Sequence, residues 1–134
     1  MNIILDTGPL VAMLNRRDAF HHWSVAEAAK LSPPFYSCEA VITEAHFLLR
    51  GIPLGTERLL EFVESGRLDL SFSYAVHQAR IGELMRGYKN VPMSFADACL
   101  VRLNEERAGR VFTLDSDFRI YRKHGRDKLD LIIP

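Results

Sequence analysis

Two aspartates each follow a short apolar run, at the point where a buried strand would end. Asp6 comes directly after residues 2–5, and Asp115 comes directly after residues 111–114. If both runs are strands of one parallel sheet, both aspartates lie at the carboxyl edge, where open α/β sheets bind ligands. Aspartate is also favoured at the start of a helix, so helix capping explains either residue taken alone equally well.

Glu44 interrupts the apolar pattern of a predicted helix. Val41, Glu44, Ala45 and Leu48 recur at i, i+3, i+4 and i+7, the spacing of one helix face. A buried and unpaired carboxylate is strongly destabilising, so Glu44 on this face needs a metal ion, a basic partner or a proton. A structural ion pair with an arginine elsewhere in the chain is the alternative.

Asp97 has two interpretations that are compatible with its neighbours. It is the fourth residue of Ser94–Asp97, a capping-box pattern in which the acid accepts a hydrogen bond from the amide of the cap residue. Leu100 and Val101 follow it at i+3 and i+4, so the same side chain points toward a partly apolar helix face.

Together these acids predict a cluster of carboxylates at one edge of the sheet. Asp117, two residues after Asp115, either joins the cluster or caps the turn into residues 118–120. Carboxylates that lie this close repel one another, so the cluster persists only if a cation neutralises it or some members are protonated. Carboxylate oxygens are ligands for hard divalent ions, which favours Mg²⁺ or Mn²⁺ over zinc.

Short apolar runs alternate with helical patterns along the chain. The spacing predicts strands over residues 2–5, 35–37, 67–72, 111–114 and 129–133, and helices that begin at Thr7, span 19–31, run from 41 to Gly51, surround 59–63 and 81–88, and run from Ser94 to Gly109. This alternation is typical of a parallel sheet covered on both faces. We therefore expect a three-layer α/β/α fold with a central parallel sheet, in a single domain over residues 1–134.

The composition is that of a folded globular chain without net charge. Of 134 residues, 48% are hydrophobic and 25% are charged, which excludes a disordered tail or a fibrous repeat. Basic and acidic residues number 17 each, so a nucleic acid would have to be bound by a local basic patch. No basic leader and no apolar stretch near the roughly 20 residues of a membrane span is present, and Cys38 and Cys99 lack metal or disulfide spacing. We expect a cytoplasmic protein with reduced thiols and no membrane association.

Three parts of the sequence carry a resemblance to a known family. They are residues 4–12 (ILDTGPLVA), residues 42–45 (ITEA), and residues 94–98 (SFADA) with 113–118 (TLDSDF) downstream. In this order and spacing they resemble the PIN-domain ribonucleases, and within that family the toxins of VapBC-type toxin–antitoxin pairs. The resemblance implies a parallel sheet between helices and a metal-dependent phosphodiesterase.

The resemblance also implies roles for individual residues. The metal-site acids of the family match Asp6, Glu44, Asp97 and Asp115, with Asp117 as a fifth candidate and Thr113 as a supporting hydroxyl. The sequence departs from the pattern at Gly8, where many relatives carry a small hydroxyl or amide residue. The catalytic acids and the candidate ligands of Mg²⁺ or Mn²⁺ are therefore expected to be Asp6, Glu44, Asp97 and Asp115, with Asp117 added to the ligands.

The implied reaction is hydrolysis of RNA phosphodiesters. Metal ions would acidify the attacking water and stabilise the leaving oxygen, leaving a 5′-phosphate and a 3′-hydroxyl. The resemblance further implies a homodimer and an antitoxin protein with a segment over the acidic groove. The densest basic run is Arg119, Arg122, Lys123, Arg126 and Lys128. This run either holds RNA phosphates beside the metal or forms an ordinary solvated surface.

Other function classes remain open on the sequence alone. A PIN-like module could bind RNA or a protein without cleaving. A phospho-acceptor domain of receiver type also places acids at strand ends, but it needs a lysine near the last strands, and none occurs between Lys89 and Lys123. Asp6–Gly8 is also the tripeptide of aspartic proteases, which are all-β proteins, whereas here the tripeptide leads into a helical pattern.

Overall fold

Five short strands form one parallel sheet with β1 at its centre. The computed structural model describes all of residues 1–134, and the strand order is β3-β2-β1-β4-β7. Two further strands, β5 and β6, form a separate antiparallel ribbon. The bounds are β1 Asn2–Leu5, β2 Phe35–Tyr36, β3 Leu68–Asp69, β4 Gly109–Phe112, β5 Arg122–Lys123, β6 Asp127–Lys128 and β7 Asp130–Ile132. The expected parallel sheet is confirmed.

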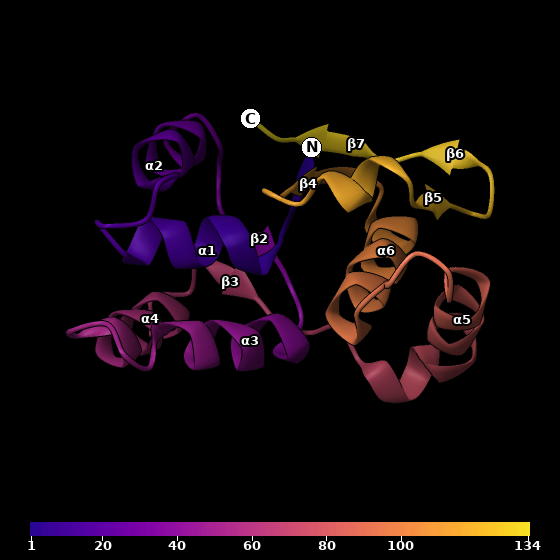
Figure 1. Ribbon diagram of the computed structural model, residues 1–134, viewed down its shortest axis with the longest axis horizontal. Coiled ribbons are helices and arrows are strands. Elements are labelled where there is room, and N and C mark those ends of the chain that lie inside the picture. The colour runs from indigo at the N-terminus through magenta and orange to yellow at the C-terminus, as the bar shows by residue number, and fades with distance from the viewer.

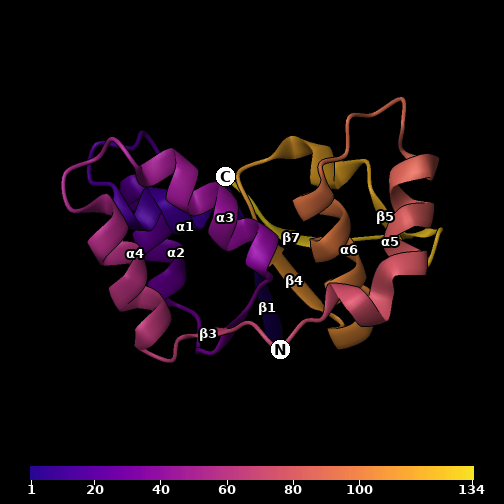
Figure 2. The same ribbon diagram turned by 90° about the horizontal axis from the view of Figure 1, so that it is seen from below.

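Helices cover the sheet on both sides (Figure 1). They are α1 Thr7–Leu14, α2 His21–Ala29, α3 Glu39–Leu49, α4 Gly55–Glu64, α5 Tyr74–Gly87, α6 Phe95–Arg107 and the 3-10 helix η1 Ser116–Arg119. In Figure 2, α1, α2 and α4 lie on one side of the strands and α5 and α6 on the other, while α3 lies between them and contacts both α1 and α6. The expected layering of helices around a central sheet is therefore confirmed. None of the helices is both long and apolar enough to span a lipid bilayer.

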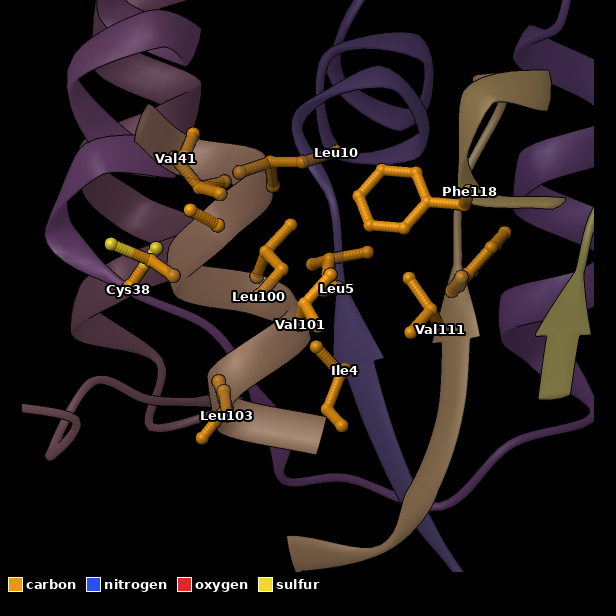
Figure 3. Close-up of a cluster of buried hydrophobic side chains, with 14 of the residues drawn as sticks. Ile4, Leu5, Leu10, Cys38, Val41, Leu100, Val101, Leu103, Val111 and Phe118 are labelled. Atoms are coloured by element: carbon orange, nitrogen blue, oxygen red, sulfur yellow. The ribbon is translucent and has the colours of Figure 1, made fainter. Parts of the chain in front are cut away.

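The main core lies between the central strands and α6. Figure 3 shows Ile4 and Leu5 of β1 and Val111 of β4 beside Leu100 and Val101 of α6. All five side chains are completely buried, and they belong to a cluster of 26 buried hydrophobic residues. A strand between two helical layers needs apolar side chains on both faces, which is why β1 has an unbroken apolar sequence.

The strand order reverses between β1 and β4. From β1 the chain adds β2 and then β3 on one side, and it then returns to add β4 and β7 on the other side of β1. The loops after β1 and β4 therefore diverge and leave a crevice at the carboxyl edge, which is the usual ligand position in open α/β sheets. Asp6 follows β1, and Asp115 lies three residues beyond the end of β4.

Strand β4 begins and ends earlier than the apolar run 111–114 predicts. It spans Gly109–Phe112, so Gly109 is its first residue and not the end of the preceding helix. A Cβ at Gly109 would collide with the backbone carbonyl of Asn2 in β1, and only glycine permits this close approach. Helix α6 instead ends at Arg107, and Ala108 adopts a left-handed conformation with φ 43°.

Strand β3 is much shorter than the predicted strand over residues 67–72. It contains only Leu68–Asp69, because the Asp69 carboxylate accepts hydrogen bonds from both the N–H and the hydroxyl of Ser71 and so forms a turn. The second helix and the last strand are also shorter than predicted, with observed bounds His21–Ala29 and Asp130–Ile132. The sequence pattern did not predict the β5-β6 ribbon or η1.

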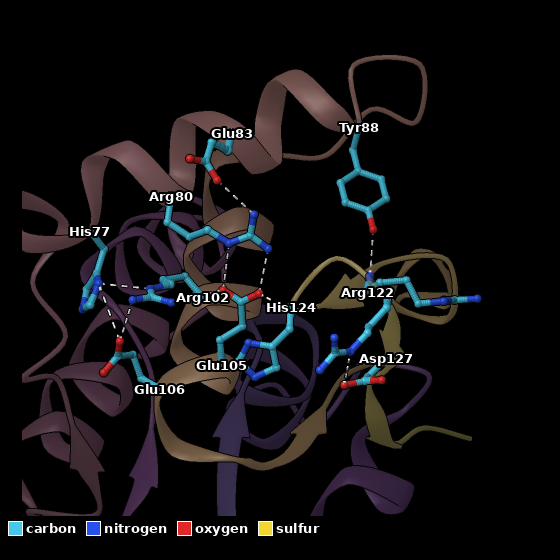
Figure 4. A network of polar contacts seen from close by, with 11 residues as sticks. His77, Arg80, Glu83, Tyr88, Arg102, Glu105, Glu106, Arg122, His124 and Asp127 are labelled. Carbon is cyan, nitrogen blue, oxygen red and sulfur yellow. Dashed lines mark hydrogen bonds and ion pairs between the residues drawn. The ribbon is translucent and has the colours of Figure 1, made fainter.

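A polar network fixes the β5-β6 ribbon against α5 and α6 (Figure 4). Glu105 of α6 has a side chain only 1% exposed and accepts hydrogen bonds from Arg80 of α5, with the shorter N–O distance 2.7 Å. Its carboxylate also accepts from the N–H of His124, in the turn of the ribbon, and lies 3.3 Å from Nη1 of Arg102. Tyr121, which directly precedes the ribbon, is completely buried.

Candidate metal centre

A cavity of about 580 Å³ opens at the crevice between the loops after β1 and β4. Four carboxylates line it, and they come from four separate segments: Asp6 after β1, Glu44 in α3, Asp97 in α6 and Asp115 after β4. The remaining lining residues are Thr7, Gly8, Leu48, Pro92, Ser94, Leu114 and Ser116. The structure thus brings together the four acids that the sequence singles out, at the edge of the sheet where the strand order changes.

Asp6 is the most buried of these acids, with 6% of its surface exposed. It is the N-cap of α1, because its Oδ1 accepts the N–H of Thr7 at 2.7 Å, and its Oδ2 accepts the hydroxyl of Thr113 at 2.7 Å. Burial raises the pKa of Asp6 to about 7, the two hydrogen bonds oppose that rise, and the charges of Asp97 and Glu44 add to it. Capping and membership of the cluster, the two alternatives from the sequence, therefore occur together.

Glu44 lies at the rim of the cavity rather than inside an apolar stripe. The buried positions of α3 are Val41, Ala45 and Leu49, whereas Leu48, predicted to share the buried face, is 52% exposed. Glu44 is half-buried, and its Oε2 accepts a hydrogen bond from the hydroxyl of Thr7 at 2.7 Å. The structural ion pair with an arginine, considered from the sequence, is not formed; Glu44 takes part in no salt bridge.

Asp97 also combines two roles in the fold. Its backbone N–H donates to the Ser94 hydroxyl at 3.0 Å, and its Oδ2 accepts the N–H of Ser94, so the predicted capping box of α6 is present. The same Oδ2 accepts the hydroxyl of Tyr121 at 2.9 Å. Burial raises the pKa of Asp97, hydrogen bonds from Tyr121 and Ser94 counteract this, and the charge of Asp115 adds to it. Oδ1 accepts no hydrogen bond within the protein.

Thr113 connects the two loops of the crevice. Its hydroxyl donates to Asp6 and accepts the N–H of Asp115 at 2.9 Å. Asp115 in turn accepts the N–H of Asp117 on its Oδ1 at 2.8 Å and caps η1. Asp117 does not line the cavity. The hydrogen bond that joins it to Asp115 comes from its backbone amide.

Glycine at position 8 is explained by a close neighbour. A Cβ at Gly8 would stand 3.2 Å from the side chain of Leu114, across the crevice, which is tighter than ordinary van der Waals contact. A larger residue at this position would require the Leu114 side chain to shift.

The basic run after η1 does not line the cavity. Arg122 donates from Nη1 to the carbonyl oxygens of Arg119, Ile120 and Tyr121, and thereby closes the end of η1. Arg126 lies 3.7 Å from the carboxylate of Asp127, within the ribbon turn. Arg119, Lys123 and Lys128 are likewise absent from the cavity wall.

Two positioning residues escaped the sequence reasoning. Thr7 holds Asp6 by its N–H and Glu44 by its hydroxyl, and Tyr121 holds Asp97. The only sequence signal for Thr7 is its place directly after Asp6. For Tyr121 there is none, because its contact with Asp97 depends on how the β5-β6 ribbon folds back over α6.

The chemistry of the cavity fits a hard divalent cation. None of its four carboxylates takes part in a salt bridge, and Glu44, Asp97 and Asp115 each keep one oxygen free of protein hydrogen bonds. Oxygen-only ligands with uncompensated negative charge are what Mg²⁺ and Mn²⁺ prefer. As the side chains stand, no three acidic, histidine or cysteine groups are arranged around one point to hold an ion. Coordination of one ion by three of these groups would therefore require their side chains to move.

Comparisons with known proteins give a consistent picture. The model of the PIN domain family matches residues 3–131. No curated protein matches the sequence. Among solved structures, VapC20 of Mycobacterium tuberculosis, a sarcin-ricin loop cleaving toxin, is 19% identical with a TM-score of 0.77, over 87% of this chain and 92% of that one. VapBC2 of Rickettsia felis, solved with a DNA fragment from its promoter, is 18% identical with a TM-score of 0.69, over 100% of this chain and 99% of that one. Since the family model spans nearly the whole sequence and the fold is the same, this chain belongs to the PIN domain family.

Proposed function

We propose that this protein is a metal-dependent endoribonuclease that acts as the toxin of a toxin–antitoxin pair. The observation that carries the proposal is a cavity with four carboxylates from four segments and no cationic partner. Carboxylates that lie close together without a cationic partner destabilise the fold, and a site that binds a divalent cation and a phosphodiester would account for their presence. The fold shared with VapC20, described as a toxin that cleaves the sarcin-ricin loop, supports RNA as the substrate.

The residues of this chain have separable tasks in such a reaction. Asp6, Glu44, Asp97 and Asp115 would hold the cation, and bound there Mg²⁺ or Mn²⁺ supplies a more acidic water and compensation for charge on the phosphate oxygens. Thr7 and Thr113 fix Asp6, and Thr7 also orients Glu44. Tyr121 and Ser94 engage Oδ2 of Asp97 and leave its Oδ1 directed to other partners. Asp117 is proposed to contribute only if its side chain turns toward the cavity.

The products identify the nucleophile. Attack by water forms a new P–O bond and breaks the bond from phosphorus to the 3′-oxygen, which leaves as the hydroxyl after taking a proton. The ends are then a 5′-phosphate and a 3′-hydroxyl. Attack by the ribose 2′-hydroxyl would give a 2′,3′-cyclic phosphate instead.

The test is RNA cleavage by purified protein with Mn²⁺ or Mg²⁺, with product ends mapped, against the Glu44→Gln variant. Glu44 is chosen because its side chain makes a single hydrogen bond within the protein, with Thr7, so the variant should keep the fold. Glu64→Gln is the matched control, since it removes one carboxylate charge from an exposed position of α4 that does not line the cavity. We expect cleavage that EDTA abolishes, that Glu44→Gln lowers by orders of magnitude and that Glu64→Gln largely retains. Cleavage in EDTA, or cyclic phosphate ends, refutes the mechanism. RNA binding without cleavage under any metal would establish the binding-module alternative.

Two partners follow from the same proposal. An antitoxin protein is expected, in line with the VapBC pair that shares this fold, and coexpression with its cognate antitoxin should relieve any growth arrest that the protein causes in a bacterial host. A homodimer is expected as well. Phe47 and Leu48 are 60% and 52% exposed on α3, Leu48 also lines the cavity, and a second copy would cover both side chains. Light scattering after size exclusion measures the mass directly.

A further inference from the structure

A second cavity, of about 260 Å³, is lined by three arginines. Arg16 and Arg17 follow the end of α1, and Arg58 lies in the first turn of α4. The other lining residues are Asn15, Gly51, Ile52 and Pro53. No acidic residue contributes to the wall, so this pocket has the opposite charge to the candidate metal centre.

The guanidinium groups of this arginine pocket have almost no partners within the protein. None of the three forms a salt bridge, and the side chains of Arg16 and Arg17 donate no hydrogen bond. Arg58 makes a single long bond, 3.4 Å from Nη1 to the carbonyl oxygen of Leu14. By contrast, Arg80 and Arg102 are each bound by Glu105. The donors of the arginine pocket are thus available to a ligand.

Attraction of the arginines to the carboxyl end of α1 explains only part of their clustering. The carbonyl groups at the end of α1 favour a nearby cation, and the bond from Arg58 to Leu14 satisfies that preference. Two further guanidinium groups around the same cavity raise the local positive charge beyond what one helix end offsets. The amino end of α4 adds to it, since Leu54 gives it no side-chain cap, although the exposed Glu57 in the same turn subtracts from it.

The ligand that fits is a phosphate group. Guanidinium groups bind phosphate oxygens through paired N–H donors, and three of them around one cavity can surround an oxyanion. A carboxylate ligand would leave much of this donor capacity unused.

The position of the pocket connects it to the candidate metal centre. Helices α1 and α3 lie side by side (Figure 1). The acidic cavity is lined by Asp6, just before α1, and by Glu44 and Leu48 of α3, whereas the arginine pocket is lined by residues that follow the ends of the two helices. From Asp6 to Asn15, at 1.5 Å per residue, the separation along α1 is about 13 Å. A stacked strand has one phosphate per about 3.4 Å, so the two sites are spaced by roughly four nucleotides, and by fewer on an extended strand.

We propose that Arg16, Arg17 and Arg58 bind a backbone phosphate of the RNA substrate several nucleotides from the bond that is cleaved. This inference rests on the proposed ribonuclease function and adds a contact that sets the register of the RNA across the acidic cavity. It also gives an electrically neutral chain a local attraction for a polyanion. Bases are not read at this site, so its contribution is to affinity and position rather than to sequence preference.

The test is binding of a labelled single-stranded RNA by fluorescence anisotropy at several salt concentrations. All proteins carry Asp6→Asn, so that RNA remains intact in Mg²⁺. The variant is Arg16→Gln/Arg17→Gln, both exposed positions whose loss should leave the melting temperature unchanged. The matched control is Lys30→Gln/Arg86→Gln, which removes the same charge from exposed positions outside the pocket.

We expect the arginine variant to raise Kd about tenfold and to lower the slope of log Kd against log salt by about 0.7, the value for one phosphate contact on a single strand. The control should change neither by more than a small amount. Equal effects of both double variants, or no effect of either, overturn the proposal. A second arm measures thermal stabilisation by inorganic phosphate. Stabilisation that the arginine variant abolishes, with RNA binding unchanged, would show a pocket for free phosphate and also overturn it.

The two proposals fail in different ways. RNA binding that depends on Arg16 and Arg17, in a protein that never cleaves RNA, refutes the nuclease and keeps the phosphate site. The opposite result is metal-dependent cleavage by the protein together with an arginine variant that binds RNA as tightly as the control variant. That result refutes the phosphate site and keeps the nuclease.

Discussion

The metal-free protein should lose stability as the pH rises through neutrality, and Asp6 should be the main cause. The residue is 6% exposed, and burial raises the pKa of its carboxyl group from 3.8 to about 7. At pH 5 the folded protein therefore keeps a proton on Asp6, whereas the unfolded chain has lost it. Where the folded state binds more protons than the unfolded state, the free energy of unfolding falls with rising pH.

The size of the effect follows from the width of this window. The stabilisation from the proton on Asp6 is complete below about pH 4, decreases as pH rises and is gone above about pH 7. From pH 5 to pH 8 the folded group titrates over about two pH units, at about 1.4 kcal/mol each, which gives about 3 kcal/mol. Asp6→Asn removes this dependence because asparagine does not titrate. The amide also exchanges an accepted hydrogen bond from Thr113 for a donated one, a constant cost of about 1 kcal/mol.

Urea unfolding in EDTA at pH 5 and pH 8 measures the effect for wild type and Asp6→Asn. The free energy of unfolding of wild type minus that of the variant should decrease by about 3 kcal/mol between the two pH values, so that the variant is the more stable protein at pH 8. Glu64→Gln, at an exposed position outside the cavity wall, serves as the control and should show no comparable change. A wild-type to Asp6→Asn difference that stays constant within about 1 kcal/mol over this range would refute the assignment of a buried, proton-binding Asp6.

Three other perturbations test neighbouring parts of the structure. Millimolar Mg²⁺ or Mn²⁺ should raise the melting temperature by binding only the folded state, and Asp97→Asn should weaken this response; no shift with either ion in calorimetry would count against the cation site. Tyr121→Phe removes the hydroxyl that Asp97 accepts and should cost about 1 kcal/mol in urea unfolding, with a smaller metal-induced shift; wild-type behaviour in both would show that Tyr121 does not position Asp97. For Glu105, burial alone would raise the pKa, but hydrogen bonds from Arg80, the N–H of His124 and Arg102 lower it overall. The ionised carboxylate therefore stabilises the fold at pH values above the pKa of the unfolded chain, and this stabilisation is lost as the pH falls and the group becomes protonated. Glu105→Gln should therefore destabilise at pH 7 by about 3 kcal/mol and less near pH 3, and an equal loss at both pH values would contradict the ion-pair assignment.

The sequence predicted the layered fold because its strands are nearly pure apolar runs. Residues 2–5 form a central strand with helices on both sides, and such a position tolerates little else. Boundaries were less predictable. Gly109 begins β4 because of the approach of Asn2, and Asp69 ends β3 through Ser71, both of which depend on three-dimensional contacts or a single side-chain turn.

The four acids of the cavity could be selected from the sequence since each occupies a position where a charge is costly. The structure places all four on one cavity wall; their part in catalysis and metal binding stays a prediction. Thr7 and Tyr121 could not be selected in this way. Threonine and tyrosine are unremarkable at a helix start or beside an apolar core, and their hydrogen bonds to Glu44 and Asp97 join residues far apart in the chain.

The capping box at the start of α6 gives Asp97 a genetic signature different from that of Glu44. If production of the protein arrests growth, as the proposed toxin function implies, surviving cells carry variants that inactivate it, and these variants can be sequenced and their protein levels measured. Substitutions of Asp97 disturb the amide of Ser94 and the start of a core helix, so they should be recovered as scarce, degraded protein. Substitutions of Glu44 affect one hydroxyl at the rim, so they should be recovered as abundant and inactive protein. The ratio of survival to protein abundance at each codon therefore separates residues needed for folding from those needed only for the reaction.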